Sequence, residues 1–223
     1  SRIRNTGRRK LMKLNNLKRF HIALCGAGGT GKGTLLKAFS ELYKPSNYVQ
    51  LSSPLKPIGT LFIPESSSYA DMEMENKKIF QYSALAAQMN AERTARDNNL
   101  SFLSERSVID FIPYYYDALA QDDYYLRYSK IIYKYLAENP YDILVYLPIE
   151  FDPHDEKAGQ WKERDTGKRM NTDEGLRNEL EKIRIKLPDI HILEVRGTPE
   201  TRAKIIYETL KEIDRQLYNR VVD

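Results

Sequence analysis

The sequence predicts an α/β fold, in which a five-stranded parallel sheet carries helices on both faces. Three observations support this prediction. β-prone runs alternate with amphipathic helical segments along the chain, which is the pattern of strands joined by helical crossovers. A glycine-rich stretch at 26–34 separates the first β-prone run from the first helical segment, where such folds place a tight turn. The 223 residues, 41% of them hydrophobic, suit one domain with a sizeable core.

Five short runs rich in aliphatic, β-branched and aromatic residues are expected to form the strands. The fourth reads Y-D-I-L-V-Y-L and ends at Pro148, a residue that cannot continue a strand ladder. The five runs are Phe20–Cys25, Tyr48–Leu51, Ser101–Ser104, Tyr141–Leu147 and Ile190–Val195.

Helices are expected between these runs, wherever apolar residues recur at helical spacing. The last helix begins at Pro199, a residue favoured in the first helical turn. Two connections, 52–69 and 152–170, are expected to be loops because the first is rich in Pro and Ser and the second is polar. The expected helices cover about Leu35–Tyr43, Asp71–Asp97, Val108–Ala120, Asp122–Glu138, Asp173–Leu187 and Pro199–Tyr218.

The glycine-rich stretch reads G-A-G-G-T-G-K-G-T and matches the phosphate-binding pattern G-x-x-x-x-G-K. Its glycines let consecutive backbone N–H groups face one centre, and the helix N-terminus that follows adds partial positive charge. Lys32 supplies a full charge to the β- and γ-phosphates. We therefore expect ATP to be bound by Gly26, Ala27, Gly28, Gly29, Thr30, Gly31, Lys32, Gly33 and Thr34.

Position 33 departs from the common pattern, which has Ser or Thr after the lysine. The order G-K-G-T is similar to the adenylate-kinase style of loop, which favours small-molecule phosphotransfer over a switch GTPase. In that style the hydroxyl linked to Mg²⁺ comes from Thr34, or the ion is held largely through water and the phosphates. Because His21, His154 and His191 are scattered and there is one cysteine, we expect Mg²⁺ arriving with the nucleotide to be the metal.

Glu105 and Arg106 follow the third expected strand, at the sheet edge where open α/β folds bind ligands. A carboxylate facing the phosphate loop could orient Mg²⁺ and its water or accept a hydroxyl proton, and Arg106 could hold a substrate phosphate. We predict catalytic roles for Lys32, Glu105 and Arg106, and metal binding by Thr34 and Glu105. The alternative is a surface ion pair that caps the next helix.

The run Phe102–Asp110 (F-L-S-E-R-S-V-I-D) resembles the E-R-S segment of deoxyribonucleoside kinases and is similar to the D-R segment of thymidylate kinases. The chain from about 19 to 215 can be laid on that pattern, which implies a P-loop NTPase fold of the kinase type. The resemblance makes Gln81 a candidate to read a base edge. The segments 173–177 and 195–202 also resemble the looser ribosylnicotinamide-kinase-like group of P-loop proteins, many of which come from phages or bacteria.

The sequence departs from this family pattern just past the second expected strand, where deoxyribonucleoside kinases carry an acidic residue that serves as the general base. Here the sequence reads L-S-S-P at 51–54, and the first carboxylate is Glu65. Either Glu105 takes that role, or the acceptor is already a phosphate, as in nucleoside monophosphate kinases. The substrate-binding candidates are Ser52, Gln81 and Arg106.

The polar stretch at about 152–177 resembles the lid of such kinases. Arginines that arrive when a lid closes stabilise the charge on the γ-phosphate oxygens. Arg164 and Arg169 are the predicted catalytic arginines, with Lys168 and Arg177 behind them. A charged surface loop is the alternative, because mixed-sign charge would be found there too.

Arg196 and Gly197 follow the last strand, where P-loop kinases hold the adenine ring, so we expect them in the nucleotide site. Eight of the 16 tyrosines lie between Tyr114 and Tyr135. Such a concentration predicts an aromatic core or a homodimer face or, alternatively, a base-stacking platform.

Residues 1–19 contain eight basic residues and no acid, whereas the whole chain has a net charge of +4. We divide the chain into a basic arm at 1–18, expected to be flexible, and a kinase domain at 19–223. The arm is either a disordered leader or a contact for nucleic acid. No apolar run approaches the roughly 18 residues of a membrane span, and a lone cysteine, Cys25, fits a reducing, cytoplasmic compartment.

The leading functional prediction is Mg²⁺-dependent transfer of the γ-phosphate of ATP to a nucleoside or a nucleoside monophosphate. A second prediction keeps this chemistry but makes DNA or RNA the acceptor, bound through the basic arm and the tyrosines. A third is a P-loop ATPase or nucleotide-gated binding module without a small-molecule acceptor.

Overall fold

The computed structural model describes residues 19–43, 47–62, 71–119, 123–150 and 166–222. Its centre is an all-parallel sheet of five strands in the order β2-β3-β1-β4-β5. All five predicted strands are confirmed, with small shifts at their ends. They are β1 (His21–Cys25), β2 (Tyr48–Leu51), β3 (Ser101–Ser104), β4 (Ile143–Tyr146) and β5 (His191–Glu194).

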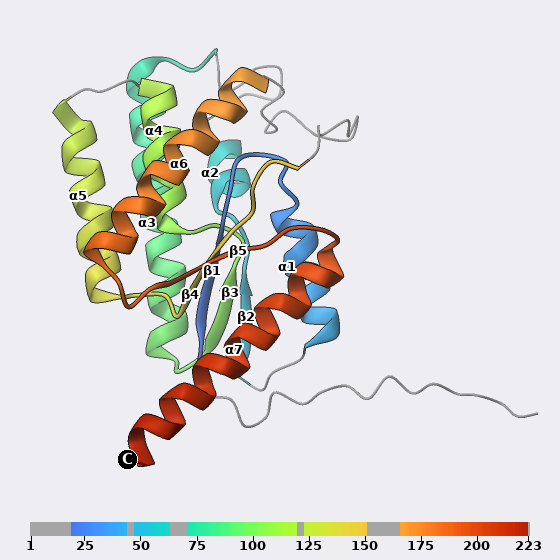
Figure 1. Ribbon diagram of the computed structural model, residues 1–223. Coiled ribbons are helices and arrows are strands. Elements are labelled where there is room, and N and C mark those ends of the chain that lie inside the picture. Colours follow the sequence, from blue (N-terminus) through green and yellow to red (C-terminus); the bar gives the residue numbers. More distant parts are fainter. Residues whose placement is uncertain (1–18, 44–46, 63–70, 120–122, 151–165, 223) are drawn as a thin grey trace, which may run out of the picture.

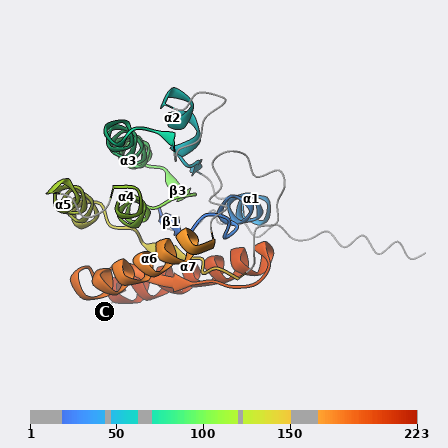
Figure 2. The same cartoon turned by 90° about the horizontal axis from the view of Figure 1, so that it is seen from above.

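Helices cover both faces of the sheet, as predicted (Figures 1 and 2). One face carries α1 and α7, which pack against each other. The other carries α3, α4, α5 and α6. The bounds are α1 (Lys32–Leu42), α3 (Met74–Asp97), α4 (Phe111–Leu119), α5 (Asp123–Glu138), α6 (Thr166–Lys186) and α7 (Pro199–Val222), and a short 3₁₀ helix η2 (Val108–Asp110) precedes α4.

The central strand β1 divides the core into two halves. Ile22 and Leu24 point into the half under α1 and α7, and Ala23 and Cys25 point into the half under the other four helices. This alternation follows from the two-residue period of a strand. Because both faces are covered, the strand is apolar and buried from Ile22 to Cys25, as parallel strands usually are.

The prediction of a loop over 52–69 is wrong in its first part, where α2 (Leu55–Phe62) forms. Apolar residues at helical spacing outweigh the proline content, because Pro57 lies in the first turn, where a backbone N–H has no helical partner. The Ser53 hydroxyl accepts a hydrogen bond from the Leu55 N–H at 3.4 Å. The Phe62 ring packs edge-on against Phe80 of α3, with 6.2 Å between the ring centroids.

The helix α6 begins at Thr166, earlier than the predicted Asp173. The local sequence T-G-K-R-M-N-T favours a loop, but tertiary contacts override this weak propensity. Lys168 and Arg169 therefore lie on a helix. Arg164, the rest of the predicted lid before residue 166, and the arm at 1–18 lie outside the described residues.

None of the helices in the described part of the chain is long and apolar enough to cross a bilayer.

Candidate functional site

The loops that follow four of the strands meet at the carboxyl edge of the sheet, where open α/β folds bind ligands. They are the phosphate loop after β1, the segment Glu105–Asp110 after β3, Glu150 after β4, and Arg196–Thr198 after β5. Hydrogen bonds between these loops, described below, make them one site.

The phosphate loop adopts a backbone conformation that depends on its glycines. Gly29 and Gly31 have φ values of 74° and 87°, in the left-handed region that other residues rarely enter. A Cβ on Gly26 would lie 2.6 Å from the carbonyl oxygen of Leu147. The first helix begins right after Gly31, so its free N–H groups face the loop. This stretch is built to receive an anion.

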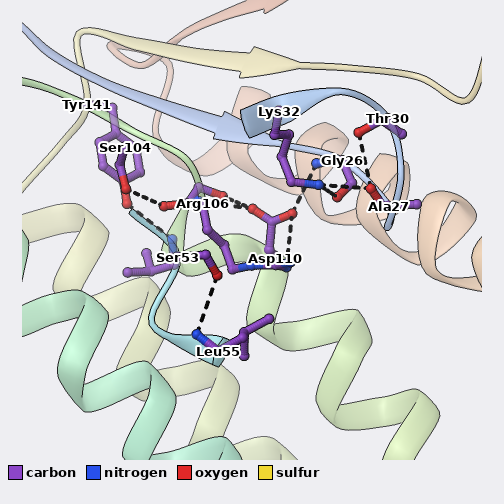
Figure 3. A network of polar contacts seen from close by, with 12 residues as sticks. Gly26, Ala27, Thr30, Lys32, Ser53, Leu55, Ser104, Arg106, Asp110 and Tyr141 are labelled. Atoms are coloured by element: carbon purple, nitrogen blue, oxygen red, sulfur yellow. Dashed lines mark hydrogen bonds and ion pairs between the residues drawn. The ribbon is translucent and has the colours of Figure 1, made fainter. Parts of the chain in front are cut away.

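Lys32 is folded back on the loop that precedes it. Its Nζ donates to the carbonyl oxygens of Gly26 at 2.5 Å and Ala27 at 2.8 Å, as Figure 3 shows. The side chain is buried, and burial together with the charge of Arg106 lowers the pKa of Lys32 to about 8. A bound phosphate would offer this ammonium group a better partner than two neutral carbonyls.

Glu105 lies against the start of α1. Its Oε1 is 3.1 Å from the point where a Cβ on Gly33 would stand, and its Oε2 accepts a hydrogen bond from the Ser53 N–H at 3.1 Å. The carboxylate is therefore held beside the loop that would carry the phosphates. Thr34 is exposed on the same first turn, and Ser52 is the exposed neighbour of Ser53.

Asp110 joins the segment after β3 to the phosphate loop. Its Oδ1 accepts the Gly26 N–H at 3.0 Å. Its Oδ2 accepts both the N–H and the hydroxyl of Ser107, at 3.0 and 2.7 Å. Our sequence predictions missed Asp110, although S-x-x-D before an apolar run is a capping-box signal that could have marked it as structural.

Arg106 is a buried cation with unused hydrogen-bonding capacity. Only 7% of the residue is exposed, its guanidinium lies 4.8 Å from the centroid of the Tyr114 ring, and Nη1 is 3.9 Å from Asp110 Oδ1. Nε and Nη1 have no hydrogen-bond partner within the described residues. Because buried donors normally find acceptors, these two atoms make Arg106 a candidate to bind an anion.

Arg169 reaches the phosphate loop from α6. Its Nε donates to the carbonyl oxygen of Gly28 at 2.9 Å, and only 2% of the residue is exposed. Lys168 is exposed. Arg177 instead donates through Nε to the Tyr146 hydroxyl at 2.8 Å and to Asp173 at 3.0 Å. These hydrogen bonds join α6 to the end of β4 and do not reach the phosphate loop.

The two glutamines of α3 differ in their surroundings. Gln81 is buried, and its backbone carbonyl accepts the Tyr128 hydroxyl at 3.1 Å. Gln88 is also buried, and its Nε2 donates to Glu92 at 2.7 Å and to the Ser104 hydroxyl at 2.8 Å. The role of Gln81 as a base reader stays a prediction.

Arg202 is a site residue that sequence reasoning missed. It is 2% exposed, its Nη1 donates to the Thr30 carbonyl at 2.8 Å, and its Nη2 pairs with Glu150. Glu150 also accepts the Gly197 N–H, at 3.2 Å to each oxygen. Arg202 thus fastens the phosphate loop to the loop of Arg196 and Gly197. Its position on a helix far along the chain gave no signal.

The residues at this edge fit a triphosphate with Mg²⁺. The phosphate loop keeps its tight path only with glycine at position 26, where a Cβ would clash with the Leu147 carbonyl oxygen. Within the part of the chain that the structure describes, Nε and Nη1 of the buried Arg106 lack a hydrogen-bond partner. Among the described residues there is no cluster of three or more His, Cys, Asp or Glu side chains that could hold a metal. Nucleotide-bound Mg²⁺ needs only one or two protein oxygens, which Glu105 and Thr34 would offer.

Comparison with known proteins places this arrangement in a family. A family model described as an AAA domain matches residues 21–202, from β1 to the first turn of α7. No curated protein matches the sequence significantly.

Solved structures share the fold at low identity. Deoxyadenosine kinase from M. mycoides with bound dCTP gives a TM-score of 0.61 at 15% identity, covering 86% of this chain and 99% of that one. Thymidylate kinase from Candida albicans gives 0.60 at 17% identity, with coverages of 89% and 93%. NadR protein in complex with NR gives a TM-score of 0.64 at 16% identity. The match covers 85% of this chain but only 51% of the NadR chain. The predicted kinase-type fold is confirmed.

Proposed function

This chain belongs to the AAA domain family, and we propose that it is a Mg²⁺-dependent kinase that moves the γ-phosphate of ATP to a nucleoside monophosphate or a nucleoside. The observation that carries this proposal is the pair Glu105 and Arg106 beside the phosphate loop. Two nitrogens of the buried Arg106 guanidinium have no hydrogen-bond partner in the described part of the chain, although Nη1 lies 3.9 Å from Asp110. An ATPase needs only the donor cradle, whereas a second anion-binding group next to it suits an acceptor phosphate.

The geometry of the phosphate loop supports the donor half of the proposed reaction. Backbone N–H groups of the loop and the N-terminus of α1 would bind the β- and γ-phosphates. Lys32 would leave its two carbonyl partners and follow the γ-phosphate through transfer, stabilising the charge that spreads over its oxygens. Arg169, whose Nε donates to the Gly28 carbonyl oxygen, would add a second cation.

The chemistry that bound Mg²⁺ would supply is positive charge against the negative charge that develops on the phosphates. Glu105 would orient the ion or its water, because Ser53 holds one carboxylate oxygen and the other faces the first turn of α1. Thr34 would offer a hydroxyl from that same turn. Arg196 and Gly197 would lie beside the donor base.

A phosphate acceptor fits this site better than a hydroxyl acceptor. A nucleoside hydroxyl needs a general base in the transfer step, and within the described residues Asp110 already accepts three hydrogen bonds. Glu150, after β4, already pairs with Arg202 and accepts the Gly197 N–H. Of the carboxylates described at this edge, Glu105 then remains, and orienting the metal would occupy it. A nucleoside monophosphate needs no strong base, because its acceptor oxygen is already anionic. The related folds of deoxyadenosine kinase and thymidylate kinase support a nucleotide-sized acceptor.

The test is transfer of ³²P from γ-labelled ATP with Mg²⁺ to separate pools of nucleosides, nucleoside monophosphates in ribo and deoxy forms, and DNA. Label on a nucleoside monophosphate is expected, and Lys32→Ala should abolish it. Label only on DNA would contradict a small-molecule acceptor, and free phosphate as the sole product would identify an ATPase.

Arg106→Gln, with Arg93→Gln as its control, tests the acceptor site itself. Both arginines lie over a tyrosine ring, Arg93 at 5.5 Å from Tyr135 and Arg106 at 4.8 Å from Tyr114, but Arg93 is exposed on α3. Arg106→Gln should raise KM for the acceptor by about 10-fold or more, and Arg93→Gln should leave it unchanged. Equal effects of the two variants would remove Arg106 from the acceptor site.

A further inference from the structure

A buried carboxyl group lies behind the candidate site, in the core between α3 and α5. Glu92 of α3 is fully buried and accepts three hydrogen bonds from side chains. Its Oε1 accepts from Gln88 Nε2 at 2.7 Å and from the Tyr141 hydroxyl at 2.8 Å. Its Oε2 accepts from the Tyr135 hydroxyl at 2.9 Å. We call these four side chains the Glu92 network.

The first connection between this network and the site runs through Tyr141. The Tyr141 hydroxyl donates its only proton to Glu92, so its oxygen is free to accept. It accepts the backbone N–H of Val108 at 3.1 Å. Val108 is the first residue of η2, directly after the Glu105–Ser107 segment.

The second connection runs through Gln88. Besides Glu92, its Nε2 donates to the Ser104 hydroxyl at 2.8 Å. That hydroxyl donates in turn to the carbonyl oxygen of Arg106 at 2.8 Å. Figure 3 shows Ser104, Arg106 and Tyr141 gathered around this turn.

The two connections hold the turn from both ends. The connection through Tyr141 fixes the N–H of Val108, and the connection through Gln88 and Ser104 fixes the carbonyl of Arg106. The backbone that carries Glu105 and Arg106 is therefore tied to a single buried carboxylate. A displacement of about 1 Å at a catalytic group can cost on the order of 10²-fold in rate.

We propose that Glu92 is a positioning residue, which through Tyr141 and Gln88 fixes the turn 104–108 in the geometry that phosphoryl transfer requires. This inference rests on the proposed kinase function. Glu92 does not touch the reacting groups and is not a catalytic residue.

The chemistry of the network supports a positioning role over simple packing. Burial raises the pKa of Glu92 to about 7, against the hydrogen bonds from Gln88, Tyr141 and Tyr135 that favour its ionised form. An apolar side chain would fill the same space without that desolvation cost. A carboxylate at this position can only accept hydrogen bonds, so the Tyr141 hydroxyl must donate its proton to Glu92. The oxygen of that hydroxyl then accepts the N–H of Val108, and an apolar side chain in place of Glu92 could not orient the hydroxyl in this way.

The first test compares Tyr141→Phe with Tyr133→Phe. Tyr133 also donates to a buried glutamate, Glu179, at 2.6 Å, but that pair joins α5 to α6 and has no bond to the turn. Tyr141→Phe should lower kcat for transfer about 10-fold or more while KM for ATP changes less than about 2-fold. Tyr133→Phe should leave kcat at the wild-type value.

The second test needs no enzymatic activity. Hydrogen–deuterium exchange of peptides covering 101–110 should be faster in Tyr141→Phe than in wild type, and unchanged in Tyr133→Phe. Glu92→Gln should keep slow exchange and most of kcat, because the amide oxygen still accepts from Tyr141, whereas Glu92→Leu should behave like Tyr141→Phe. Melting temperatures of all variants identify any effect of general unfolding.

If Tyr141→Phe and Glu92→Leu both had the exchange rates and the kcat of wild type, the proposal would be overturned. The Glu92 network would then be ordinary core packing. If instead the proposed kinase function is wrong, the wild-type protein itself will transfer no phosphate to any acceptor. The exchange measurement then still decides whether Glu92 holds the turn.

Discussion

The Oε1 oxygen of Glu105 lies 3.1 Å from the point where a Cβ on Gly33 would stand. This distance gives a structural reason for the one departure of the phosphate loop from its common pattern. A serine or threonine after Lys32 would push the carboxylate away by a few tenths of an ångström. With glycine, the acidic group and the loop approach closely, and Ser53 holds the carboxylate there.

Gly33→Ala is expected to lower kcat, by up to about 10²-fold. Gly33 has no positive φ, so alanine fits the backbone and favours the helix, and the loss would come from displacement of Glu105. Steady-state kinetics of Gly33→Ala, Glu105→Gln and the double variant check this. The double variant should be no slower than Glu105→Gln, and additive losses would show that Gly33 acts independently of Glu105.

Binding of ATP should be accompanied by proton uptake near pH 8. The pKa of Lys32 is about 8 because of burial and the charge of Arg106, so part of the protein carries a neutral Lys32 at that pH. The triphosphate favours the charged form and raises the pKa, and the site takes up a fraction of a proton. Calorimetric titrations in buffers of different ionisation enthalpy measure this, with Lys32→Met as control. Equal heats in all buffers would contradict it.

Glu92→Gln should gain stability relative to wild type as the pH rises. Because burial raises the pKa of Glu92 from 4.5 to about 7, folded wild type holds a proton in that window that the unfolded chain releases. Its free energy of unfolding therefore falls between these pH values, by up to about 3 kcal/mol. Urea unfolding of both proteins from pH 4.5 to 8 is the measurement. Parallel pH profiles would mean that Glu92 is ionised throughout.

Arg202→Lys should weaken both the fold and the donor site. A lysine lacks the planar guanidinium, whose Nη1 bonds Thr30 while its Nη2 pairs with Glu150, so the free energy of unfolding should fall by about 2 kcal/mol, and Kd for ATP should rise. The control is Arg215→Lys on the same helix, whose exposed partner Glu212 lies 3.3 Å away and should contribute less than about 1 kcal/mol. An unchanged Kd in Arg202→Lys would exclude a role in donor binding.

Deletion of residues 1–18 should leave transfer to a small acceptor within about 2-fold of wild type. The basic residues concentrated there would serve a nucleic-acid acceptor, whose binding weakens steeply with salt. Activity on nucleoside monophosphates and on DNA, each at several salt concentrations, separates the two cases. Loss of activity on the small acceptor would show that the arm belongs to the kinase site.

The strands and the phosphate loop could be predicted because their signals are local. A strand in a sheet covered on both faces is a short apolar run, and the phosphate-binding motif at Gly26–Lys32 depends on its own backbone and one side chain. The errors at α2 and at the start of α6 arose where local propensity and tertiary contact disagree. At the start of α6, the bond between Arg169 and Gly28 spans 141 positions, and no window of sequence contains it.

A phosphate loop before the first helix of a parallel α/β fold can be predicted from the sequence, because the φ freedom of glycine, the helix termini and the hydrophobic period act over a few residues. The side chains that surround the loop depend on tertiary packing. Asp110 bonds to Gly26 across 84 positions and Arg202 to Thr30 across 172. Tyr141 donates to Glu92 across 49 positions, and the absence of a side chain at Gly33 lets Glu105 approach the loop. Such pairings depend on how the chain packs, and no periodicity in the sequence encodes them.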